Sequence, residues 1–282
     1  MRSLQIPSRT ALEVHDLCAS GISDIAMGAR IASIRLSSSI REDHYRTTAH
    51  AEALYTLAPV KYAKTDLVIG SATKQDLTDL YEQHMVGLGK PGRDAYNHII
   101  ETPYRKCPYC DLGDATTLDH YLPKSRFPQF AILPANLVPS CRDCQGKKGR
   151  HVATNKTSQT LHPYFDHRKY VNDKWVVADI DFAGPTVARF RAEPPTAWTN
   201  DERRRASEHF KAHDLSKRYA IRAASELTML NRSLQRTRAT SGGQEVAKLL
   251  ADFADGHREL CVNSWQTALY EALSNSMRYC NG

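Results

Sequence analysis

Long apolar runs are absent from this chain of 282 residues. No stretch approaches the roughly 18 consecutive apolar residues that indicate a membrane-spanning helix. The segment Met1–Leu17 has a charged start but lacks the apolar run and the small-residue cleavage site of a secretory signal. We therefore expect a cytoplasmic protein with no membrane contact. Internal repeats and low-complexity tails are also absent, which is consistent with one or two globular domains.

Acidic residues are in deficit, with 31 Asp and Glu against 38 Lys and Arg, for a formal net charge of +7. An excess of positive charge suits a polyanion such as nucleic acid, although charge alone does not establish such a partner. Basic residues concentrate in two stretches, Cys141–Lys156 and Asp201–Thr240. The run Arg203-Arg204-Arg205 in the second stretch is interpreted as a solvated helix face.

Four of the seven cysteines form two C-x-x-C pairs, Cys107 with Cys110 and Cys141 with Cys144. Disulfides are disfavoured in a reducing compartment. Each pair is typical of a tight turn that directs two thiolates at one point, and two such turns complete the tetrahedron of a structural zinc ion. We predict one Zn²⁺ bound by these four cysteines, which would hold together a proline-rich module. The remaining cysteines are expected to be ordinary buried thiols: Cys18, Cys261 and Cys280.

Periodicity predicts an α+β chain that is mainly helical. Apolar residues recur at helical spacing through the first hundred residues, up to a helix at about Arg93–Glu101. Prolines then interrupt residues 103–165, where only short strands are expected. Lys174–Ile180 and Thr186–Arg191 flank Ala183-Gly184-Pro185 as a hairpin would. Further helices are expected at 200–213, 215–237, 243–258 and 262–278, with a break at Ser241-Gly242-Gly243. The resulting parts are 1–103, 104–166, 167–199 and 200–282.

Between the cysteine pairs lie Asp119 and His120 at a predicted strand end, followed by a loop and Asn136. Hydrolysis of a phosphodiester requires an activated water and neutralisation of the developing negative charge, and a divalent cation supplies the second. Asp119 is a suitable oxygen ligand for Mg²⁺. His120, with an ordinary pKa of about 6.5, suits a general base.

The arrangement resembles the HNH (ββα-metal) endonucleases whose core is braced by two C-x-x-C zinc turns. The resemblance runs from Cys107 to about Asp166. It implies a small zinc-stapled ββα core embedded between N- and C-terminal helical parts. It also implies metal-dependent cleavage of nucleic acid, with DNA the usual substrate of the family. In this pattern Asp119 binds the catalytic Mg²⁺ or Mn²⁺, His120 activates the water, and Asn136 orients the histidine and its loop.

The chain departs from the family at Gln145, where the pattern has a His or Asn that binds the catalytic cation. A Gln carbonyl can serve as a weaker ligand, because its extra methylene adds rotamer freedom. Alternatively His162 replaces it, or activity is reduced. A packed structural role for His162 is an equal alternative, and His151 is a poorer substitute. Basic residues around the predicted helix are expected to contact phosphates, or else to form a solvated face: Lys124, Lys147, Lys148 and Arg150.

The overall layout also resembles the PtuB-like HNH subunits of Septu-type anti-phage defence systems, which work with a partner ATPase. Glu208-His209-Phe210 and Leu215–Tyr219 carry this resemblance, together with His162–Asp166. It implies that the C-terminal helices dock a protein partner such as an ATPase. Two alternatives stay open at this point. One is an HNH nuclease that cleaves RNA or tRNA. The other is a non-catalytic, zinc-containing nucleic-acid-binding or interaction module.

Overall fold

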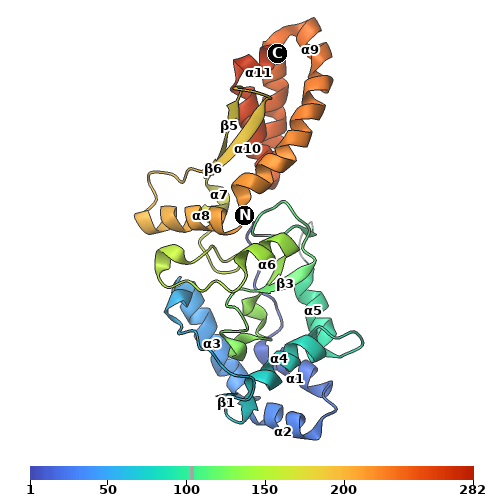
Figure 1. The fold of residues 1–282 in the computed structure, drawn as a ribbon, viewed down its shortest axis with the longest axis vertical. Coiled ribbons are helices and arrows are strands. Elements are labelled where there is room, and N and C mark those ends of the chain that lie inside the picture. The colour runs from blue at the N-terminus through green and yellow to red at the C-terminus, as the bar shows by residue number, and fades with distance from the viewer. Residues whose placement is uncertain (102–104) are drawn as a thin grey trace. The chain divides into compact units, whose positions relative to one another are not determined.

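The computed structural model describes residues 1–101 and 105–282, which divide into two compact units. One unit comprises Leu4–Pro108 and Gly113–Asp166, and we call it the N-terminal unit. The other, the C-terminal unit, comprises Met1–Ser3, Tyr109–Leu112 and His167–Gly282. Figure 1 shows the elements of each unit, and most of them are helices. The prediction of a mainly helical chain is therefore confirmed.

The N-terminal unit contains helices, short strands and single turns of 3₁₀ helix. Its helices are α1 (Ala11–Ser20), α2 (Ile25–Ser33), α3 (Ser37–His50), α4 (Lys74–Asp79), the π-helix η2 (Leu80–Met85), α5 (Gly92–Ile100) and α6 (Arg142–Lys148). The strands are β1 (Leu67–Ile69), β2 (Ala72–Thr73), β3 (Thr117–His120) and β4 (Leu137–Ser140). The 3₁₀ turns are η1 (Leu54–Thr56), η4 (Pro128–Phe130), η5 (Pro134–Asn136) and η6 (Lys156–Ser158).

Threonine caps fix where several helices begin. The side chains of Thr10, Thr73 and Thr199 each accept a hydrogen bond from the third residue of the helix, whose carboxylate bonds back to the cap. Such reciprocal bonds satisfy backbone N–H groups that the first turn of a helix leaves unpaired. The described helix α5 matches the predicted segment Arg93–Glu101 to within one residue.

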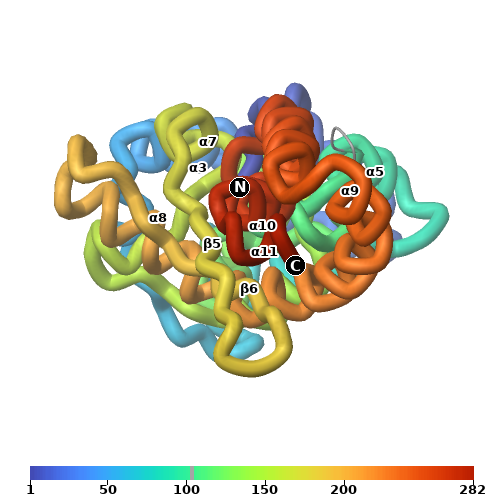
Figure 2. Tube along the Cα trace, turned by 90° about the horizontal axis from the view of Figure 1, so that it is seen from above, coloured from blue at the N-terminus to red at the C-terminus, as the bar shows by residue number. Residues whose placement is uncertain are grey.

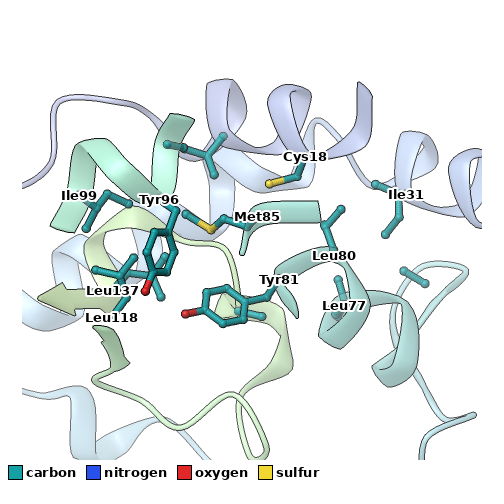
Figure 3. Close-up of a cluster of buried hydrophobic side chains, with 14 of the residues drawn as sticks. Cys18, Ile31, Leu77, Leu80, Tyr81, Met85, Tyr96, Ile99, Leu118 and Leu137 are labelled. Carbon is teal, nitrogen blue, oxygen red and sulfur yellow. The ribbon is translucent and has the colours of Figure 1, made fainter. Parts of the chain in front are cut away.

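The core of the N-terminal unit joins its helices to the β3–β4 pair. Buried side chains of α1, α2, α4, η2 and α5 pack together with Leu118 of β3 and Leu137 of β4 (Figure 3). The two strands are antiparallel, with His120 opposite Leu137 and Thr117 opposite Ser140. Helix α6 follows β4 after Cys141 alone. This strand–strand–helix segment is therefore anchored on a helical core through its own apolar residues.

In the C-terminal unit a two-stranded sheet packs on helices. It contains α7 (Lys169–Asn172), β5 (Val176–Asp181), β6 (Val187–Ala192), α8 (Asn200–Ala212), α9 (Leu215–Leu260), α10 (Trp265–Ser274) and α11 (Met277–Asn281). Helix α10 packs on β5 and against α9 (Figure 2). The predicted hairpin is confirmed, since β5 and β6 pair antiparallel. The predicted break appears inside α9, where Gly242 has a φ of 80°.

Across the described ranges, 1–101 and 105–282, none of the helices combines the length and the apolar character needed to cross a bilayer. The long helix α9 owes its length to two helical segments that meet at Gly242. Its buried face is apolar and most of its exposed residues are polar or charged, although Ile221, Met229, Phe253 and Leu260 are exposed as well. The helix therefore packs as an amphipathic helix of a globular unit.

Candidate functional site

The four paired cysteines come together in the fold. All four are buried, and their Sγ atoms lie within 4.8 Å of one another. A Zn–S bond of about 2.3 Å in tetrahedral geometry places sulfurs about 3.8 Å apart, so this spacing fits a bound zinc ion. The cluster therefore has the donor atoms and the spacing of a structural metal site, as the sequence predicts.

Hydrogen bonds to the sulfurs also fit thiolate ligands. The backbone N–H of Leu112 donates to Cys110 Sγ at 3.4 Å, and that of Cys144 donates to Cys141 Sγ at 3.4 Å. The guanidinium of Arg218 lies 3.6 Å from the same Cys110 sulfur. Donors and a positive charge stabilise the deprotonated form of a thiol, which is the form that binds a metal.

The first C-x-x-C turn, Cys107–Cys110, is held by residues of α8 and α9. His209 Nε2 lies 2.8 Å from the carbonyl of Tyr109, and the hydroxyl of Tyr219 donates to the carbonyl of Cys110 at 2.7 Å. Burial lowers the pKa of His209 to about 3, so its ring is neutral near pH 7 and donates through Nε2. The sequence offered no signal that these residues brace the turn.

Asp119 forms a buried ion pair with Lys148 of α6. The Nζ of Lys148 lies 2.8 Å from Asp119 Oδ2, and the two side chains are 4% and 5% exposed. The same ammonium donates to the carbonyl of His120 at 2.6 Å. Sequence reasoning expected Lys148 to face phosphates, but in the structure it joins α6 to the end of β3.

His120 is the last residue of β3 and is also buried. Its Nε2 lies 2.8 Å from the carbonyl oxygen of Ala131, so in the neutral ring Nε2 carries the proton and Nδ1 is the basic nitrogen. Its ring meets that of Tyr81 edge to face, with 4.4 Å between centroids. Burial lowers the pKa of His120 to about 3, with Lys124 and Lys148 contributing. A negative charge beside the ring, such as that of a bound phosphate, would raise this pKa.

Asn136 ties together the loop that follows His120. It is fully buried, and its Oδ1 accepts from the backbone N–H of Leu122 at 2.7 Å and from the hydroxyl of Tyr45 at 3.0 Å. Its Nδ2 donates to the carbonyls of Leu122 and Phe130 at 3.1 and 3.2 Å. All four bonds go to the loop or to Tyr45, so Asn136 orients the loop rather than bonding the ring of His120.

Gln145 and His162 both have protein partners. Gln145 Nε2 donates to the carbonyl of Leu118 at 3.1 Å, which binds α6 to β3. His162 is 1% exposed, with Nε2 at 3.2 Å from the hydroxyl of Tyr45 and Nδ1 at 3.3 Å from the N–H of Tyr164. The ring of Tyr121 lies 4.1 Å from that of His162. These contacts favour the packed role of His162 that the sequence left as an alternative.

The other predicted phosphate contacts lie nearer the surface. Lys124 is half-buried, pairs with Glu82 and lies over the ring of Tyr81. Lys147 and Arg150 are exposed. Among the described residues, the four cysteines form the single group of three or more His, Cys, Asp or Glu ligands gathered closely enough for a metal. A second cation at Asp119 would therefore rely on few protein ligands, as Mg²⁺ often does.

We expect the stability of the protein to depend on divalent cations once Asp119 loses its ion pair with Lys148. Lys148→Met leaves a buried carboxylate without its counter-charge, which should cost roughly 3–5 kcal/mol of stability. If Asp119 is a cation ligand, millimolar Mg²⁺ or Mn²⁺ should restore part of this loss. Thermal unfolding with and without the cation measures the effect, and exposed Lys147→Met is the matched control. If the cation stabilises both variants equally, Asp119 is not a ligand of the cation.

Comparison with known proteins gives a relative that matches along the full length. The chain is 30% identical to protein ea31 of Escherichia phage lambda over 295 aligned residues, which cover 100% of both chains. It is also 33% identical to the Septu protein PtuB of Bacillus thuringiensis over 73 residues, which are 24% of this chain and 28% of PtuB. No protein-family model and no solved structure matches the chain.

Proposed function

The chain belongs to the family of the lambda protein ea31, and from its site we propose that it is a metal-dependent HNH endonuclease that hydrolyses phosphodiester bonds of DNA. One observation carries the proposal. Asp119 and His120 end a strand that pairs with β4, and β4 leads into a short helix whose start holds two cysteines of a buried four-cysteine cluster. The local similarity to PtuB supports the same conclusion.

The cysteine cluster would bind the structural zinc, and the neighbouring residues would act on the substrate. His120 Nδ1, left basic by the bond from Nε2 to Ala131, would accept a proton from the attacking water. Asn136 would hold in place the loop whose Ala131 carbonyl bonds this ring. Asp119 and the carbonyl of Gln145 are the oxygen donors that a catalytic Mg²⁺ or Mn²⁺ would use. Such a cation, when bound, stabilises negative charge on the phosphate oxygens.

The proposed nuclease core spans 104–166, between a helical part at 1–103 and a hairpin at 167–199 that leads to helices at 200–282. We place the protein in anti-phage defence, acting with a partner such as an ATPase, because of its likeness to the Septu protein PtuB. Helices α8 and α9 each bond the Cys107–Cys110 turn, through His209 and Tyr219. A partner that moved α8 or α9 would therefore act on the metal-binding turn itself.

A specific observation favours a second candidate, a zinc-containing nucleic-acid-binding module without catalysis. The Asp119 carboxylate is already paired with Lys148, and Gln145 stands where the family has His or Asn. Cleavage distinguishes the two candidates. We expect purified protein with added Mg²⁺ to nick supercoiled plasmid and to leave total RNA intact. Binding of plasmid and RNA without cleavage of either would favour the second candidate. Cleavage of RNA alone would identify the enzyme as a ribonuclease.

Gln145 should set how tightly the catalytic cation is held. A shorter ligand loses less rotamer entropy on binding, so Gln145→Asn should lower the Mg²⁺ concentration for half-maximal cleavage, and Gln145→Ala should raise it. His162→Phe serves as the comparison, because it keeps an aromatic ring in the packed site and removes both nitrogens. If His162 is the ligand instead, His162→Phe abolishes cleavage and Gln145→Ala leaves the metal dependence unchanged.

A further inference from the structure

A cavity of about 410 Å³ in the N-terminal unit is lined by four basic side chains. They are Lys61, Lys74, Arg126 and Arg150, and Tyr62 and Ser125 lie among them. No Asp or Glu is among the described residues that line it. The positive charges around this cavity repel one another, and a bound anion would offset the repulsion. The composition of the lining therefore indicates an anionic ligand.

The basic groups of the cavity differ from most others in this unit. Arg30 pairs with Asp76, Lys124 with Glu82 and Lys148 with Asp119. Within the described residues, by contrast, no ion pair involves any of the four cavity cations.

Two polar side chains of the cavity lining are also incompletely bonded. The Nε of Arg126 and the hydroxyl of Ser125 are buried and have no hydrogen-bond partner among the described residues. The Nζ of Lys74 donates to the uncharged carbonyl of Tyr62 at 2.7 Å. Buried donors without partners are rare and costly, and phosphate oxygens would satisfy them.

Part of the cavity lining belongs to the proposed nuclease core. Ser125 and Arg126 belong to the loop that starts at His120 and ends at Asn136. Arg150 lies just beyond the end of α6, which carries Gln145 and Lys148. The backbone N–H of Val60 donates to the carbonyl of Arg126 at 3.2 Å, and this bond holds the segment of Lys61 against the loop.

We propose that this cavity binds a backbone phosphate of the polynucleotide substrate, beside the phosphate that is cleaved. The proposal rests on the proposed nuclease function, and it gives the polynucleotide a second point of contact with the protein. Lys61 and Arg150 are exposed, so they can follow a strand that continues past the cavity. A free nucleotide offers the same phosphate chemistry, but a site for a small ligand usually encloses most of its surface.

Binding of a fluorescent DNA duplex, measured by anisotropy over a salt series, tests the proposal. The full-length protein carries His120→Ala, and no Mg²⁺ or Mn²⁺ is added, so the readout does not depend on cleavage. Lys61→Ala with Arg150→Ala removes two cavity charges. Lys64→Ala with Arg142→Ala is the matched control, because it removes two exposed charges from the same segments outside the cavity.

The cavity variant should bind about tenfold more weakly than the control, and its plot of log affinity against log salt should be shallower by about one to two, since each phosphate contact contributes nearly one to that slope. Equal affinities and slopes for the two variants would overturn the proposal. Binding of AMP to the same variants tests the alternative of a free nucleotide. The proposal would also be overturned if only the cavity variant lost saturable AMP binding while its duplex binding was unchanged, because the cavity would then bind a free nucleotide. If the cavity substitutions weaken duplex binding but the wild-type protein never cleaves DNA, the phosphate-binding role of the cavity is supported and the proposed nuclease function is refuted.

Discussion

Replacing His120 by alanine should lower the rate of phosphodiester hydrolysis by at least about 10²-fold, the usual contribution of a positioned general base. The side chain is buried at the end of β3, and its hydrogen bond from Nε2 to the carbonyl of Ala131 leaves Nδ1 as the basic nitrogen. Loss of this ring should leave zinc content and nucleic-acid affinity nearly unchanged, because neither the cysteine cluster nor the basic cavity contains it.

His151→Ala is the matched control, since His151 is exposed and lies just beyond α6. Single-turnover cleavage of an end-labelled duplex compares the two variants with the wild-type protein, and circular dichroism checks that each is folded. The neutral ring of His120 also has a consequence for how its protonation depends on pH. Because burial holds the pKa of His120 near 3 when no phosphate lies beside the ring, the base of the substrate-free protein remains deprotonated from neutral pH down to mildly acidic pH. Cleavage by His120→Ala at the wild-type rate would exclude this residue as the base.

Serine in place of Cys107 or Cys144 should abolish tight zinc binding and destabilise the protein by several kcal/mol, because metal binding and folding are coupled where a site forms only in the folded state. Both sulfurs are buried within the four-cysteine cluster. Cys280→Ser is the matched control. Its thiol is buried outside the cluster and donates to the carbonyl of Leu273 at 3.4 Å, a bond that a serine hydroxyl can keep.

Elemental analysis for zinc and thermal unfolding measure these effects together. Wild-type protein should contain one zinc per chain, and prolonged exposure to a strong chelator should lower its unfolding temperature toward that of Cys107→Ser. The Cys280→Ser protein should keep its zinc. A wild-type protein without bound zinc, or equal stabilities for Cys107→Ser and Cys280→Ser, would contradict the metal site.

Features set by local spacing were predictable from the sequence. Each C-x-x-C pair forms its turn from neighbouring residues, so the cluster followed once both turns were recognised. Gly242 adopts a positive φ that side chains other than glycine rarely take, and the break in α9 falls there. The helical spacing of apolar residues through the first hundred residues was misleading at 51–58. Helix α3 ends at His50, and only the short turn Leu54–Thr56 follows.

Features that depend on distant contacts were not predictable. Tyr45 bonds both Asn136 and His162, yet nothing near it in the sequence distinguishes it from any tyrosine on a helix. Lys148 looked like a surface cation because its neighbours are basic, and only the packing of α6 on β3 brings it to Asp119. The ordinary pKa expected for His120 overlooked its burial beside Tyr81. Each of these depends on how the strand pair sits on the helical core.

The most direct test of the central claim is plasmid nicking by the zinc-loaded wild-type protein as Mg²⁺ or Mn²⁺ is added stepwise. We predict that nicking is absent without added cation, rises to a plateau as the cation saturates its site, and falls by at least about 10²-fold in His120→Ala at every concentration. Nicking that is independent of added cation, or that persists unchanged without His120, would contradict the account.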